Sequence, residues 1–198
     1  YDVYRGLEIN RRLAKMNAIT ATDMQQLQNV NYNPFAEVFT KLMLKYTNPA
    51  LLSADDKRFF ELIRQWDLQN NVKSAAATVF QVWVDSLKTK IWYDELTQQD
   101  SVVYAWPYDN TLADALTRDS AFTFIDDIRT PAKETIYDVF VASLKAATPV
   151  LLQKEKDGKL EWAANKNTTV YHILKDAVLP FARNGLSIGG GKHIINAT

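Results

Sequence analysis

Histidine and cysteine, the side chains that most often bind transition metals, are scarce in this sequence. The 198 residues include two histidines and no cysteine. His172 and His193 match neither an H-x-x-x-H nor an H-E-x-x-H spacing, so no zinc site is expected and no metal ligand is assigned. We expect His172 to pack beside Tyr171 and His193 to lie on a turn.

Two pairs of adjacent carboxylates, Asp55-Asp56 and Asp126-Asp127, are the next candidates, because two carboxyl groups can act as acid and base. Neighbouring residues on a helix do not face one another, so we interpret both pairs as solvated caps. Gly185 and the run 189–191 do not fit G-x-G-x-x-G, and we interpret them as flexible backbone. No G-x-S-x-G motif occurs, and these residues alone assemble no complete active site.

Arg5 is the remaining candidate. It lies in the first turn of an expected helix, where a cation opposes the helix dipole at a cost of a few tenths of a kcal/mol. An exposed guanidinium with no role is one interpretation. A functional contact that offsets the cost is the other.

The composition bounds the classes of function. Lysine plus arginine and aspartate plus glutamate each number 23, so the net charge of zero gives no electrostatic reason to expect nucleic acid or an anionic membrane as a partner. No apolar run approaches the roughly 18 residues of a membrane span, and no signal-peptide pattern opens the chain. The 47% hydrophobic content suffices for one domain, or a large part of one.

The dominant hydrophobic period is helical, and several helix starts carry capping residues. Thr20 with Asp23 and Ser53 with Asp56 have the spacing of capping boxes, and Asn33-Pro34 has a cap followed by proline. We expect helices over 3–16, 20–29, 33–46, 53–66 and 74–96, one or two short helices between 98 and 128, among them 111–118, and a last strong helix capped by Thr130-Pro131 and ending near 147.

The C-terminal part has a weaker pattern. Residues 154–159 indicate a polar turn, 162–182 are expected to be mostly irregular, and the glycine run before 192–196 indicates a turn that leads into a strand. The predicted fold class is therefore mainly α, with a short β segment at the C-terminal end. Residues 1–185 form the predicted helical region, and residues 186–198 form the turn and the start of the strand.

Six segments follow one another along the chain: RGLEINRRL at 5–13, AITATDMQQLQNVNYNPFA at 18–36, LIRQWD at 62–67, SAAATVFQVWVDSL at 74–87, LEWAANKNTTVYHI at 160–173 and GGGKHIINAT at 189–198. Their order resembles the penicillin acylase (penicillin amidase) family of N-terminal-nucleophile hydrolases. Departures from the family pattern are Leu68 where glycine is usual, Ala163-Ala164 in place of tryptophan-glycine, and Ile194-Ile195 in place of Thr-Val.

The resemblance implies an αββα sandwich in the parent protein, with this chain as an internal, helical piece of the β chain. In the family the β chain begins with a serine that is nucleophile and, through its α-amine, general base. Tyr1 cannot take that role, so the nucleophile and the oxyanion-hole asparagine are expected outside these residues. Arg5 aligns with the arginine that orients that asparagine and the substrate. The family's calcium ligands are also expected elsewhere, so no cofactor is expected here.

The implied function of the parent is hydrolysis of a linear amide C–N bond, in a periplasmic or secreted bacterial enzyme. Substrates of the implied class are penicillin-like amides, acyl-homoserine lactones or other acylated amines, and the implied partners are the rest of the α and β chains. The 198 residues alone are expected to be inactive. Two alternatives remain open: a non-catalytic helical binding module, and a degenerate acylase homologue that has lost activity.

Overall fold

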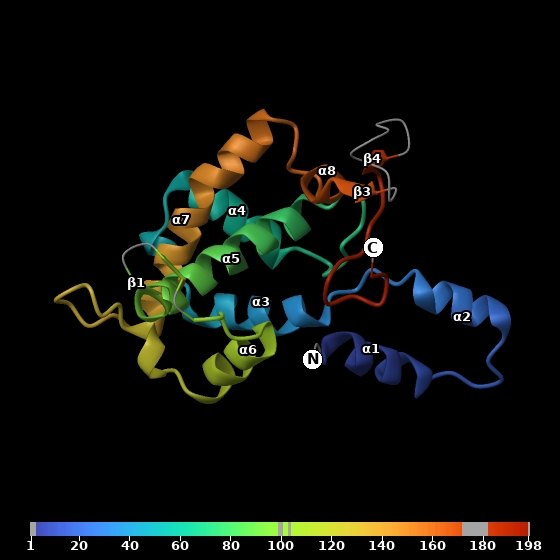
Figure 1. Cartoon of the computed structure of the whole chain (residues 1–198), viewed down its shortest axis with the longest axis horizontal. Coiled ribbons are helices and arrows are strands. Elements are labelled where there is room, and N and C mark those ends of the chain that lie inside the picture. Colours follow the sequence, from blue (N-terminus) through green and yellow to red (C-terminus); the bar gives the residue numbers. More distant parts are fainter. Residues whose placement is uncertain (1–2, 99–100, 103, 172–181, 198) are drawn as a thin grey trace.

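The computed structural model describes residues 3–98, 101–102, 104–171 and 182–197 (Figure 1). This part of the chain is mainly helical with short antiparallel strands, which confirms the predicted fold class. The helices are α1 (Tyr4–Leu13), α2 (Ala21–Gln28), α3 (Pro34–Tyr46), α4 (Ala54–Arg64), α5 (Ala75–Leu96), α6 (Asp109–Arg118), α7 (Ile136–Lys156) and α8 (Trp162–Lys166), with short 3-10 turns at Pro49–Leu51 and Thr123–Ile125.

The predicted capping signals begin the helices as expected. In α2 and α4 the cap hydroxyl of Thr20 or Ser53 accepts a hydrogen bond from the amide three residues later, and the acidic side chain there accepts from the cap amide. Asn33 caps α3, and Pro34 occupies its first turn. These local signals explain why α2, α3 and α4 begin where the sequence predicts, whereas α1, which has no side-chain cap, ends at Leu13 and not at residue 16.

The core forms where α5 and α7 pack along one another, with α3 and α4 closing its sides (Figure 1). Trp83 of α5 is fully buried, and its Nε1 atom donates a hydrogen bond of 2.9 Å to Ser143 Oγ of α7. Phe39 of α3 and Phe140 of α7 pack against the same indole. Large apolar side chains at helical spacing thus produce a single apolar cluster.

Helix α7 differs from its predicted bounds at both ends. Thr135, and not Thr130, is the N-cap, and it forms a capping box with Asp138. The helix also passes through Pro149 and ends at Lys156. The hydroxyl of Thr148 donates to Leu144 O and to Asp56 Oδ1 of α4, so buried contacts hold the helix beside the proline.

The β structure near the C-terminus is a two-stranded antiparallel sheet of β3 (Thr168–Val170) and β4 (Arg183–Leu186). A second pair, β1 (Thr97–Gln98) and β2 (Ser101–Val102), follows α5. The prediction that residues 192–196 begin a strand is wrong, because they form a turn. The short helix α8 and β3 also differ from the mostly irregular structure expected over 162–182, of which residues 172–181 lie outside the described residues.

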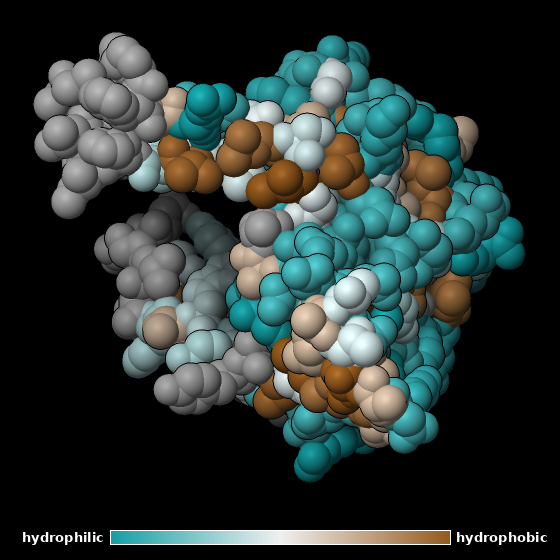
Figure 2. Space-filling view, turned by 90° about the vertical axis from the view of Figure 1, so that its right-hand side faces the viewer, coloured by the Kyte–Doolittle hydropathy of each residue, from teal (hydrophilic) through white to brown (hydrophobic). Residues whose placement is uncertain are grey.

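Helices α1 and α2 extend from one side of the helical body, and residues 187–197 lie beside the segment that joins α2 to α3 (Figure 1). Figure 2 views the molecule from this side, where most of the surface is hydrophilic and hydrophobic residues gather in separate patches. The exposed apolar residues of this region include Leu7, Ile19 and Met24. Within α1, Leu7 is exposed and Glu8 is buried.

Candidate functional site

Arg5, the candidate named from the sequence, lies near the start of α1 and binds the other end of the described chain. Its Nε atom donates to the carbonyl oxygen of Ile194 at 2.8 Å, and its Nη2 atom donates to the carbonyl oxygen of Lys192 at 3.0 Å. The planar guanidinium therefore makes two contacts on alternate carbonyls of one turn, which fixes its orientation as well as its position. This contact supplies the offset to the unfavourable helix dipole.

The turn that binds Arg5 follows the glycines 189–191, which are buried. A Cβ atom on Gly189 would lie 2.8 Å from Asn70 O and 2.7 Å from Asn31 Nδ2, and Gly190 has a φ of +83°. Glycine is needed here for close approach and for a left-handed backbone. The interpretation of this run as flexible backbone is therefore wrong, because its residues are buried against the 31 and 70 segments.

A network of asparagine side chains lies beside the same turn. The segment 30–33 runs antiparallel to 68–70, joined by a bridge between Tyr32 and Gln69. Asn196 joins the C-terminal turn to this pair of segments. Its main-chain N–H donates to Val30 O, and its side-chain Nδ2 atom donates to Asn31 Oδ1. Side-chain amides both donate and accept, so one residue type can link three chain segments. The asparagine residues of the network are Asn31, Asn33, Asn70, Asn71 and Asn196.

Asp109 anchors the side chains of the turn. It is the first residue of α6, is 8% exposed, and accepts Lys88 Nζ at 2.6 Å on one oxygen. Its other oxygen accepts Lys192 Nζ at 2.5 Å and lies 3.0 Å from His193 Nε2. Burial raises the pKa of the Asp109 carboxyl, but the hydrogen bonds from His193, Lys192 and Lys88 outweigh it and hold that pKa far below its usual range. Asp109 is thus a buried carboxylate bound by Lys88, Lys192 and His193.

His193 is enclosed by aromatic rings. Its ring centroid lies 4.4 Å from that of Phe35 and 5.5 Å from that of Tyr4, and the residue is 8% exposed. The expectation that His193 lies on a turn is confirmed, but the side chain is buried. A cavity of about 160 Å³ opens beside it, lined by Tyr4, Tyr108, Asp109, Asn110, Lys192 and His193.

The arrangement can hold a guanidinium rigidly. The Nε and Nη2 atoms of Arg5 donate hydrogen bonds to the turn, whereas Arg5 Nη1 has no hydrogen-bond partner among the described residues. A cation held in this way can donate to an amide or carboxylate group brought beside it. It cannot act as a base, because arginine stays protonated in proteins.

The carboxylate pairs named from the sequence form no acid–base couple. Asp56 caps α4 and accepts from Thr148, as a buried cap and not the solvated one expected. Asp126 accepts the amide of Glu134, and Asp127 pairs with Arg129. These contacts are structural. His172 lies outside the described residues.

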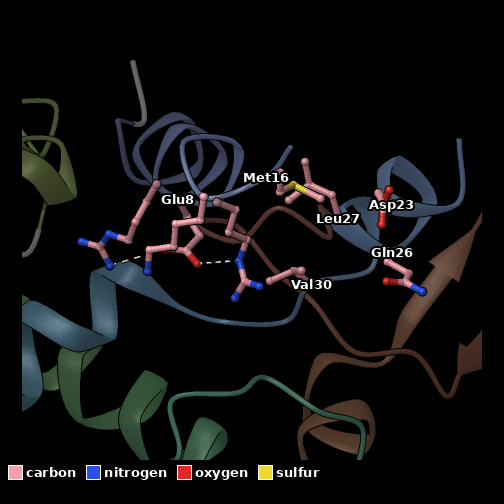
Figure 3. A pocket seen from close by; sticks show the side chains of 9 residues that line it. Glu8, Met16, Asp23, Gln26, Leu27 and Val30 are labelled. Atoms are coloured by element: carbon pink, nitrogen blue, oxygen red, sulfur yellow. Dashed lines mark hydrogen bonds and ion pairs between the residues drawn. The ribbon is translucent and has the colours of Figure 1, made fainter. Parts of the chain in front are cut away.

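A second cavity, of about 370 Å³, lies between α1 and α2 (Figure 3). Most of the charged side chains that line it already bind other residues. Glu8 is buried and binds Arg12 at 2.7 Å and Arg11 at 3.4 Å, while Asp23 caps α2. Arg11 also binds Glu37 of α3. The contacts therefore fix α1 against its neighbours. The lining comprises Glu8, Arg11, Arg12, Lys15, Met16, Asp23, Gln26, Leu27 and Val30.

The sequence did not identify Asp109, Lys88 or Lys192 as part of the Arg5 site. An aspartate at the start of a helix has the usual signature of a cap, and Lys88 lies on a long helix with many polar positions. The apolar character of Ile194 is a usable signal, because this buried residue lies two positions from Lys192.

No group of three or more histidine or acidic residues that could hold a metal ion occurs in the described part of the chain. Within the same residues, no helix is long and apolar enough to cross a membrane.

The sequence model of the family described as penicillin amidase matches residues 1–198, the whole of the chain. A search of curated proteins finds no match.

Proposed function

The chain belongs to the penicillin amidase family, and from that membership we propose that it is part of a hydrolase that cleaves linear amide C–N bonds. The nucleophile is the N-terminal serine of the mature β chain, outside these residues. The chain supplies the helical region of that β chain. Alone, it is expected to hydrolyse nothing.

The reaction divides into two steps. The serine Oγ forms a bond to the amide carbon while the α-amine takes the hydroxyl proton, and the C–N bond then breaks as the amine leaves with that proton. Backbone and asparagine donors stabilise the tetrahedral oxygen. Water next attacks the acyl-enzyme, releases the acid and restores the serine.

Arg5 is the residue of this chain that we assign to the site. The supporting observation is its fixed guanidinium, with Nε and Nη2 bound to the turn and Nη1 without a partner among the described residues. In the proposal, Nη1 orients the oxyanion-hole asparagine and the substrate. Orientation of this kind matters because a displacement of about 1 Å at a reacting group costs on the order of a hundredfold in rate.

The surroundings of the reaction follow from the same membership. We place the enzyme in the periplasm or outside a bacterial cell, with the rest of the α and β chains as its partners. We assign any calcium ion of the parent to residues elsewhere, as the family resemblance implies.

The decisive experiment is N-terminal sequencing and mass analysis of the chains that form when the full-length gene is expressed. Two chains, the second beginning with serine and hydrolysing a chromogenic phenylacetyl amide or acyl-homoserine lactone, would support a self-processing acylase. A single uncut, inactive chain would contradict the proposal and favour a scaffold or a degenerate homologue.

Activity of the 198-residue chain is the second check. The purified chain should release no more chromophore than a heat-killed control. Hydrolysis by this chain alone would contradict the assignment of the nucleophile to another segment.

A further inference from the structure

We propose that Asp109 is a positioning residue for Arg5, acting through the turn 192–194. The proposal rests on the function proposed above for its catalytic meaning, since only an acylase gives Arg5 a substrate. The physical link between the two residues does not depend on that function. It is carried by contacts among described residues.

The first step is the attachment of the turn to Asp109. Lys192 and His193 are consecutive, and both side chains bind the same carboxylate oxygen, at 2.5 and 3.0 Å. Asp109 cannot move away easily, because its second oxygen binds Lys88 of α5 and the residue is 8% exposed. The carboxylate thus holds two successive side chains against α5 and α6.

The second step concerns the main chain of the same turn. The carbonyl oxygens of Lys192 and Ile194 accept the two donors of Arg5. Side chains that bind Asp109 and carbonyls that bind Arg5 therefore belong to the same three residues. A rotation of this backbone would disturb both sets of bonds together.

The third step concerns what else fixes Arg5. No ion pair of Arg5 occurs among the described residues, and within them its side-chain hydrogen bonds go to this turn alone. Arg11 and Arg12, on the same helix, bind glutamates instead. Of these three arginines, Arg5 is the one whose orientation depends on main-chain acceptors from the C-terminal turn.

The matched comparison is Asp109→Asn against Asp114→Asn. Both residues lie on α6, but Asp114 is exposed and pairs with Arg118 four residues on, at 2.7 Å. Asparagine keeps the size of the side chain and removes its charge in both cases. Asp109→Glu keeps the charge and serves as the rescue variant.

The first readout is nuclear magnetic resonance of the arginine Nε–Hε groups in the 198-residue chain, with the Arg5 signal identified by its loss in Arg5→Lys. We expect Asp109→Asn to speed exchange of the Arg5 Hε with water about tenfold, the effect of losing one charge-assisted hydrogen bond. Asp114→Asn should leave it unchanged, and Asp109→Glu should restore most of the protection. Unchanged protection in a folded Asp109→Asn protein would overturn the proposal.

A second variant covers the case in which Asp109→Asn does not fold. Lys192→Met removes one contact to Asp109 and leaves those of Lys88 and His193 in place. Faster exchange at Arg5 in this variant supports the link through the turn. Exchange equal to that of the unsubstituted chain would count against it.

The second readout uses the self-processed enzyme. We expect Asp109→Asn to lower kcat about tenfold with little change in KM, and to cause no further loss when Arg5→Ala is already present. Additive losses would overturn the positioning role. If the full-length protein proves inactive, the exchange experiment still tests the Asp109–Arg5 link, so the two failures can be told apart.

Discussion

Arg5 Nε lies 2.8 Å from the carbonyl oxygen of Ile194, and this bond joins the first described helix to the last described turn. The two residues are 189 positions apart. A contact this distant in sequence carries a large loop-closure cost, which the packed helices between the two residues offset. The candidate site is therefore a product of the completed fold, and substitutions that displace the turn should displace Arg5 with it.

Gly189 provides a direct test of that packing. A Cβ atom there would meet Asn31 Nδ2 at 2.7 Å and the main-chain oxygen of Asn70 at 2.8 Å. Because backbone cannot move aside cheaply, we expect Gly189→Ala to destabilise the chain by about 1–3 kcal/mol in urea unfolding. A cost near zero would show that the turn can shift freely.

Gly6 is the matched control for this substitution. It lies inside α1, and a Cβ atom there would have nothing within 4 Å, so Gly6→Ala should stabilise the helix by about 0.5–1 kcal/mol. The same change at two glycines should thus have opposite signs. Equal effects would mean that backbone entropy, and not contact with Asn70, determines the result.

Local signals explain how much of the fold could be predicted from the sequence. The boxes Thr20/Asp23 and Ser53/Asp56 begin α2 and α4 as expected, because capping depends on residues three positions apart. The predicted end of α7 is wrong, since its course through Pro149 depends on a contact between Thr148 and a distant helix. Capping interactions between neighbouring residues can be predicted from a single sequence, whereas contacts between distant segments cannot.

The candidate site divides in the same way. Arg5 is a candidate predicted from its family resemblance and its unfavourable place at a helix start, and its role stays a prediction. Its partners could not be predicted, because Lys88, Asp109 and Lys192 come from three separate segments that meet only in the folded chain. The interpretation of the glycine run as flexible backbone is wrong, since nothing local distinguishes a mobile glycine from one that is closely packed.

Ser143 should carry a measurable part of the core's stability. Its hydroxyl accepts the only indole donor of Trp83, which is fully buried between α5 and α7. Ser143→Ala leaves that N–H without an acceptor, so we expect a loss of about 1–3 kcal/mol in chemical denaturation. Ser86→Ala is the control, because Ser86 donates within its own helix, to Val82 O. A similar loss for both would contradict the role of the indole bond.

Glu37 should make the attachment of α1 sensitive to acid. Its carboxylate accepts Arg11 at 2.8 Å and the hydroxyl of Tyr32 at 3.0 Å, and the hydrogen bond from Arg11 is the main cause that lowers its pKa to about 2. The folded pKa lies below the ordinary value of 4.5, so the stabilisation is present above about pH 4.5 and is lost as the pH falls towards 2.

The test compares Glu37→Gln with the unsubstituted chain from about pH 7 to about pH 2. At neutral pH we expect the variant to be less stable by on the order of 1 kcal/mol, and the difference should vanish as the pH falls from about 4.5 to about 2. Glu61→Gln is the control, since Glu61 pairs with Arg64 inside one helix. A difference that persists at the acid end of the range would contradict the assignment.

Glu95 should have the opposite pH dependence. Burial, followed by the neighbouring Asp94 carboxylate, raises the pKa of Glu95 to about 7, and its Oε2 atom is buried with no hydrogen-bond partner in the described part of the chain. Asp94 meanwhile accepts the amide of Ile128 and ties α5 to the 123–128 segment. Because the folded pKa exceeds the ordinary 4.5, stability is complete below about pH 4.5 and falls as the pH rises through about 7.

Substitution of Glu95 by glutamine removes the titrating group and should therefore remove this pH dependence. We expect Glu95→Gln to match the unsubstituted chain near about pH 4 and to exceed its unfolding free energy at about pH 8 by on the order of 1 kcal/mol. Glu161→Gln, at an exposed helix start, should show no such divergence. Parallel stability curves for Glu95→Gln and the unsubstituted chain across this range would show that Glu95 is already ionised in the folded protein at neutral pH.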